Sequence, residues 1–175
     1  AALAVMSVCF VANVVVFHSL SKRSSLPGLR VGFAAGDRRF LAPYLELRNV
    51  AAPQVPTPAQ YVAIAAYGDE THVQENRELY SAKFDLADQI IGDRYGYVRP
   101  AGGFFLWLDI SKHGGSEMVT KKLWSEGGVR VVPGRYLARE QNDGSNPGEG
   151  YIRVAMVQNK AATAEALHRL VAVLG

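Results

Sequence analysis

The order of hydrophobic and polar positions predicts that the chain opens on a buried strand. The apolar run that ends in Val14-Val15-Val16-Phe17 is rich in β-branched residues, which favours a core strand from about Asn13 that follows the end of a helix. A continuous apolar strand of this kind is typical of a parallel sheet covered on both faces. The polar segment from His18 to Arg30 is then expected to be a loop at the end of that strand.

Helical spacing dominates the next part of the chain. A short helix is expected over residues 37–50 and another over 59–67, with the proline-rich segment 53–58 as an extended connector between them. Asp69 is expected to cap a longer helix over 70–91. The apolar residues of this long helix recur at helical intervals and predict a single buried stripe, formed by Val73, Tyr80, Phe84, Ala87 and Ile91.

The remaining segments alternate between strand and helix patterns. They predict strands over 104–110, 129–132 and 151–157, and helices over 116–126 and 161–174. This order is typical of a compact α/β lobe. We therefore expect two parts: residues 1–68 as the remnant of a larger sheet domain with its connector, and residues 69–175 as a smaller α/β domain.

Composition narrows the class of protein. The 19 basic and 16 acidic residues leave a net charge of only +3, and no run of Lys or Arg exceeds two residues, which argues against a nucleic-acid partner. No basic residue precedes the apolar run Ala1 to Phe17, and Asn13 interrupts it, so we expect neither a signal peptide nor a membrane span. The single cysteine, Cys9, lies in an apolar stretch and is expected to be a small buried side chain, which fits a reducing cytoplasm.

The loop after the first strand holds the most distinctive chemistry. Ser19-Leu20-Ser21-Lys22-Arg23 gathers hydroxyls and cations, and Pro27-Gly28 closes the loop. Composition alone favours a solvated basic loop. However, loops that follow buried strands in α/β proteins commonly bind ligands, and serine hydroxyls with an arginine fork suit a phosphate.

A second candidate lies on the last predicted strand. Arg153 stands within residues 151–157, which are apolar on both alternating faces. A buried guanidinium without an anion costs several kcal/mol. Arg153 is therefore expected to meet either a protein carboxylate, as a structural ion pair, or the carboxylate of a ligand.

The segment Ser19-Leu20-Ser21-Lys22, followed by Pro27-Gly28-Leu29-Arg30-Val31-Gly32, resembles the cofactor-lysine segment of class I/II pyridoxal-phosphate-dependent aminotransferases. This resemblance implies that Lys22 forms the Schiff base with pyridoxal 5'-phosphate and that Ser19 and Arg30 bind the cofactor phosphate. It also implies that Arg153 binds the substrate α-carboxylate. The implied fold is α/β and aspartate-aminotransferase-like, with residues 1–68 from the end of the large cofactor-binding domain and 69–175 as the small carboxyl-terminal domain.

Three stretches resemble the succinyldiaminopimelate aminotransferases in particular: 16–24, 69–80, and 132–140 with 146–148. The resemblance implies amino transfer between glutamate and N-succinyl-2-amino-6-oxopimelate in bacterial lysine biosynthesis, by a homodimer in the cytoplasm. Two alternatives stay open. One is another pyridoxal-phosphate enzyme, such as a carbon-sulfur lyase or an aminotransferase for a different amino acid, and the other is a non-catalytic α/β module or the effector lobe of a regulator.

The resemblance also implies elements that this sequence lacks. The family's aspartate for the pyridine nitrogen, its stacked aromatic ring and its glycine-containing phosphate loop all come earlier than the cofactor lysine. Because the first residue is not methionine and lies inside an apolar pattern, we expect the true start to lie upstream of Ala1. The 175 residues alone are then expected to be inactive.

Overall fold

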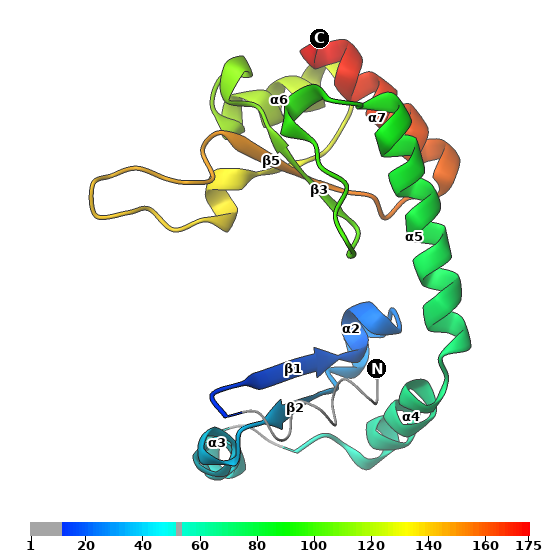
Figure 1. Ribbon diagram of the computed structural model, residues 1–175, viewed down its shortest axis with the longest axis vertical. Helices are drawn as coiled ribbons and strands as arrows, with labels where there is room; N and C mark the ends of the chain where they lie inside the picture. The colour runs from blue at the N-terminus through cyan, green and yellow to red at the C-terminus, as the bar shows by residue number, and fades with distance from the viewer. Residues whose placement is uncertain (1–11, 52–53) are drawn as a thin grey trace. The chain divides into compact units, whose positions relative to one another are not determined.

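The computed structural model describes residues 12–51 and 54–175. The predictions of a helix end before the first strand, of a buried Cys9 and of an extended Pro53 lie outside these residues. The chain forms two compact units, Ala1–Glu75 and Asn76–Gly175 (Figure 1). The limit between them falls inside helix α5 (Thr71–Ile90), whereas the sequence placed a domain boundary before Asp69; that boundary stays a prediction.

The first unit contains an antiparallel pair of strands, β1 (Val15–Ser19) and β2 (Gly32–Gly36), in which Ser19 stands opposite Gly32. The expectation of a parallel sheet is therefore wrong for this pair. The connection over residues 20–31 turns the chain back beside β1 in the opposite direction instead of crossing over a face of the sheet, so the neighbouring strands are antiparallel. The connection itself is more ordered than the predicted loop, because it contains helix α2 (Leu20–Arg23) and the 3₁₀ helix η1 (Pro27–Leu29).

The described part of the first unit before α5 also contains two longer helices, α3 (Arg38–Ala51) and α4 (Thr57–Gly68). Both agree with the helices predicted from the sequence to within a few residues. A small core of Leu20, Val31 and Ala63 joins the lysine segment to α4, and Leu20 is fully buried in it. This core fixes the base of α2.

The second unit pairs a three-stranded antiparallel sheet with helices. Its strands are β3 (Phe105–Asp109), β4 (Val132–Pro133) and β5 (Tyr151–Ala155), in the order β3-β5-β4, and helices α6 (Ser116–Gly127) and α7 (Lys160–Leu174) pack with it (Figure 1). The strand predicted over 129–132 is reduced to Val132–Pro133. Residues 129–131 form neither strand nor helix, and the N–H of Val129 caps the end of α6 by donating to the carbonyl oxygen of Leu123 at 3.0 Å.

One face of this sheet packs into the hydrophobic core of the second unit. Leu106, Leu108, Ile152 and Val154 are buried there. The predicted stripe of α5 is confirmed in outline, because four of its five residues are buried and Tyr80 is half-buried. No helix in the described parts of the chain is long and apolar enough to cross a membrane.

Candidate functional site

The helix that carries Lys22 is only four residues long and depends on its surroundings. Ser19 caps its start, because the Ser19 Oγ accepts a hydrogen bond from the backbone N–H of Ser21 at 3.1 Å. The same oxygen lies 3.3 Å from the carbonyl oxygen of Val31. A helix this short is unstable by itself, so these contacts set its position.

The two ends of the lysine segment lie side by side. The N–H of Leu20 donates to the carbonyl oxygen of Val31 at 3.2 Å, directly after the paired residues Ser19 and Gly32. A Cβ on Gly32 would lie 2.5 Å from the carbonyl oxygen of His18, so this close approach requires glycine. The predicted phosphate ligands Ser19 and Arg30 are thus brought to the same end of the strand pair.

Arg30 and Lys22 both carry exposed side chains. Arg30 has left-handed backbone angles, φ 52° and ψ 42°, and its guanidinium donates to the carbonyl oxygen of Pro27 at 2.9 Å. The segment therefore presents a hydroxyl, an amine and a guanidinium. Among the described residues no group of three or more His, Cys, Asp or Glu side chains could hold a metal ion.

Arg153 belongs to the second unit, where it lies on the sheet face opposite the core. Its guanidinium carbon lies 4.5 Å from the centre of the Phe105 ring. Its Nε is buried without a hydrogen-bond partner, and none of the ion pairs in residues 12–51 and 54–175 involves it. Across the ladder from Arg153 stands the half-exposed Trp107, which is stacked on Tyr151 with 5.4 Å between ring centres.

A set of residues that the sequence did not single out surrounds α2. The Arg23 side chain is only 6% exposed and donates to the carbonyl oxygen of Ala66 at 2.6 Å and to Glu70 Oε1 at 2.6 Å. It also lies over the ring of Tyr67, 5.4 Å from its centre. Of the two neighbouring cations, Arg23 is therefore held inside the unit while Lys22 stands exposed.

A chain of hydrogen bonds lies beside Arg23. His72 Nδ1 is 2.6 Å from Asp69 Oδ2, and His72 Nε2 is 2.9 Å from the Ser24 Oγ. The hydrogen bond from His72 lowers the pKa of Asp69 to about 2, with further help from the N–H of Thr71. The carboxylate is ionised at neutral pH and can only accept, so His72 Nδ1 is the donor to Asp69, and His72 Nε2 shares the second hydrogen bond with the Ser24 hydroxyl.

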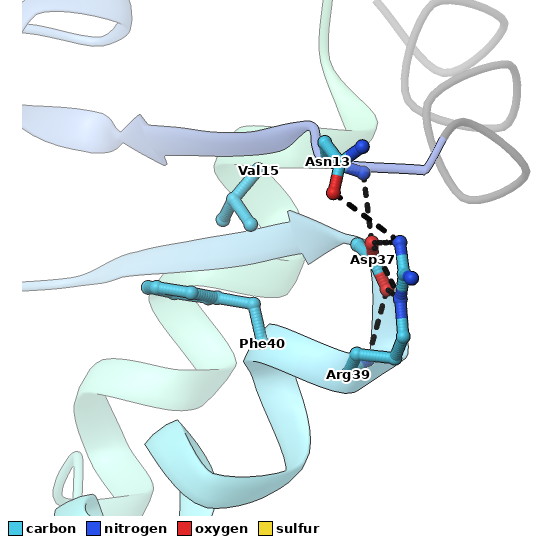
Figure 2. A pocket seen from close by; sticks show the side chains of 5 residues that line it. All are labelled: Asn13, Val15, Asp37, Arg39 and Phe40. Atoms are coloured by element: carbon cyan, nitrogen blue, oxygen red, sulfur yellow. Dashed lines mark hydrogen bonds and ion pairs between the residues drawn. The ribbon is translucent and has the colours of Figure 1, made fainter.

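A pocket lies near the start of β1. Figure 2 shows its lining residues: Asn13, Val15, Asp37, Arg39 and Phe40. The Asp37 carboxylate is bonded to the Arg39 guanidinium at 2.7 Å and to the N–H of Asn13 at 2.7 Å. The Arg39 bond, more than any other, holds the pKa of Asp37 well below its usual range. Because these charges already satisfy each other, we assign the cluster to the turn between β2 and α3 rather than to a ligand.

With this geometry in place, comparison with known proteins identifies the family. Residues 3–170 match the family "Aminotransferase class I and II", and the chain belongs to it. This match confirms the family resemblance seen in the lysine segment, and members of this family depend on pyridoxal phosphate.

Relatives place the chain within that family. The 4-dedimethylamino-4-oxo-anhydrotetracycline transaminase of Streptomyces rimosus is 31% identical over 87% of this chain and 40% of its own length. The LL-diaminopimelate aminotransferase of Syntrophobacter fumaroxidans is 30% identical over 89% and 39%, respectively. A solved aminotransferase from Neisseria meningitidis superposes with a TM-score of 0.83 at 38% identity, over 92% of this chain and 40% of that one.

The likeness to solved aminotransferases confirms the predicted α/β, aspartate-aminotransferase-like fold. The chain spans less than half the length of the relatives that it matches.

Proposed function

We propose that the protein to which these residues belong is a pyridoxal-phosphate-dependent aminotransferase with Lys22 as its cofactor lysine. The arrangement of Ser19, Lys22 and Arg30 on one segment, whose ends are joined by the Leu20 to Val31 hydrogen bond, carries this proposal. Membership of the aminotransferase family supports it.

The described side chains fit the cofactor. Ser19 offers a hydroxyl and Arg30 an exposed guanidinium to a phosphate, and Lys22 offers an exposed amine to an aldehyde. When bound, the cofactor supplies an electron sink for the negative charge that develops at the substrate α-carbon. Lys22 would then carry the proton between that carbon and the cofactor, which is the work of a general acid and base.

Arg153 is proposed to hold the substrate α-carboxylate. Its Nε is buried without a hydrogen-bond partner in the described part of the chain, and a planar guanidinium suits two parallel bonds to a carboxylate. The Phe105 ring beneath the guanidinium restricts the orientations that Arg153 can take.

For the substrates we propose glutamate as the amino donor and N-succinyl-2-amino-6-oxopimelate as the acceptor. The three sequence stretches described above support this choice, and so does the similarity to a protein named LL-diaminopimelate aminotransferase, a name built on the same pimelate skeleton. A homodimer in the cytoplasm belongs to the same proposal and rests on the family resemblance.

Acceptor profiling of the full-length protein tests this assignment. The protein, loaded with pyridoxal phosphate, is supplied with glutamate and a panel of keto acids, and release of 2-oxoglutarate is followed. We expect kcat/KM to be highest with the succinylated keto acid. A higher value with another acceptor would overturn the substrate assignment alone, while no release with any acceptor would overturn aminotransferase activity.

A further inference from the structure

We propose that Arg23, Asp69 and His72 are positioning residues that fix the helix carrying Lys22. Together with Ser24 and Glu70 they form a set that we call the α2 network. The inference rests on the proposed function, because it concerns the placement of the same lysine. It concerns only contacts within the first unit.

The need for such a network follows from the length of α2. Four residues cannot sustain a helix in water, since nucleation costs more than one turn of hydrogen bonds returns. Ser19 caps the first end of α2 and Leu20 anchors its base in the small core. The last residue of the helix, Arg23, and the residue after it, Ser24, are held by the α2 network.

Arg23 fixes that second end against two other helices. The carbonyl oxygens of Ala66 and Asp69, at 2.6 and 3.3 Å from its guanidinium, belong to the end of α4, where the last carbonyls have no partner within the helix. Partial negative charge at a helix end also attracts a cation. Glu70, at 2.6 Å, compensates the charge of this nearly buried side chain.

His72 makes the second attachment, from the first turn of α5. It bridges Asp69, which also accepts from the N–H of Thr71 at 2.8 Å, and Ser24, which accepts from Arg23 at 3.2 Å. The start of α5 and the end of α2 are therefore joined through one imidazole ring. Loss of the Ser24 contact would leave the end of α2 held by Arg23 alone, without disturbing the contact between His72 and Asp69.

Two substitutions of His72 separate these contacts. In His72→Asn the amide nitrogen takes the place of Nδ1 and keeps the bond to Asp69, whereas in His72→Gln the longer side chain reaches the place of Nε2 and keeps the bond to Ser24. The readout is borohydride trapping of pyridoxal phosphate on Lys22 in the full-length protein, measured by peptide mapping over a range of cofactor concentrations. Thermal unfolding is recorded in parallel, and His168→Asn, at an exposed position on α7, is the matched control.

We expect His72→Asn to raise the cofactor concentration for half-maximal trapping by roughly tenfold. An effect of this size is no larger than a displacement of Lys22 by about 1 Å can cause. We expect His168→Asn to leave it unchanged, and His72→Gln, which keeps the Ser24 bond but loses the Asp69 bond, to raise it less than His72→Asn does. The positioning role would be overturned if His72→Asn trapped like the parent, or if His72→Gln failed while His72→Asn did not. Absence of trapping on Lys22 in the parent protein would instead overturn the proposed function.

Discussion

The backbone N–H of Leu20 lies 3.2 Å from the carbonyl oxygen of Val31, and this hydrogen bond joins the two ends of the segment that carries the candidate site. It brings Ser19 and Arg30 together although eleven positions separate them in the printed sequence. The two proposed phosphate ligands and the proposed cofactor lysine are therefore held by one local structure, and several measurements can test their roles separately.

Ser19 and Arg30 are predicted to bind the phosphate of the cofactor and no other part of it. Ser19→Ala and Arg30→Gln should each raise the half-saturating concentration of pyridoxal phosphate, by roughly 10- to 100-fold for the arginine, because a charge-assisted hydrogen bond is worth about 1.5–3 kcal/mol. In Arg30→Gln, binding of pyridoxal, which lacks the phosphate, should not change. Arg48→Gln, at an exposed position on α3, is the control, and equal losses for both compounds would contradict the assignment.

Arg153 is predicted to bind the substrate carboxylate through its planar fork. Both Arg153→Lys and Arg153→Gln should raise KM for amino-acid donors, by roughly 10- to 100-fold for the glutamine, with a smaller effect on kcat. Lysine keeps the charge but cannot form two parallel bonds, so it should restore little. Steady-state kinetics against the exposed Arg130→Gln control test this, and an unchanged KM in Arg153→Gln would contradict it.

Leu20 is predicted to hold the base of α2 through burial. It is fully buried, and Leu20→Ala should lower the free energy of unfolding by about 2–5 kcal/mol in urea titrations. Leu79, which is 61% exposed on α5, gives a matched control whose change to alanine should cost no more than about 0.5 kcal/mol. Equal losses for the two variants would argue against a core at Leu20.

Asp69 is predicted to contribute stability that acid removes. The bond from His72 lowers its pKa from 3.8 to about 2, so the unfolded chain takes up this proton at a higher pH than the folded chain. The contribution is therefore complete above about pH 4 and is lost as the pH falls toward 2. Unfolding titrations should show Asp69→Asn below the parent at pH 5 and the two converging near pH 2, with Glu126→Gln on α6 as the control. A difference that does not vary with pH would contradict this.

The local sequence pattern predicted the longer helices well, because the apolar spacing and the end residues that mark a helix lie within a few positions of one another. The apolar stripe of α5 and its end before Gly92 are examples. Strand β2 was not predicted, since Gly32-Phe33-Ala34-Ala35-Gly36 has no β-branched residue and little alternation. Helix α2 was not predicted because four residues carry no period.

The residues of the candidate site also differ in whether the sequence alone could predict them. Lys22, Ser19 and Arg30 could be singled out because the family resemblance lies in one contiguous segment. The α2 network could not, since Ser24 and His72 are 48 positions apart and only packing brings them within 2.9 Å. For Arg153 the sequence required an anion, and the structure adds the ring of Phe105 beneath the guanidinium.

The central claim is that Lys22 binds the cofactor, and the most direct test is the site of covalent labelling. The amine and the aldehyde of pyridoxal phosphate lose water to form a carbon-nitrogen double bond, which borohydride reduces to a stable single bond. The full-length protein should carry one pyridoxyl group, mapped to Lys22 by peptide mass, and Lys22→Ala should carry none while the exposed control Lys160→Ala keeps it. A label on another lysine, or no label on the full-length protein, would contradict the account.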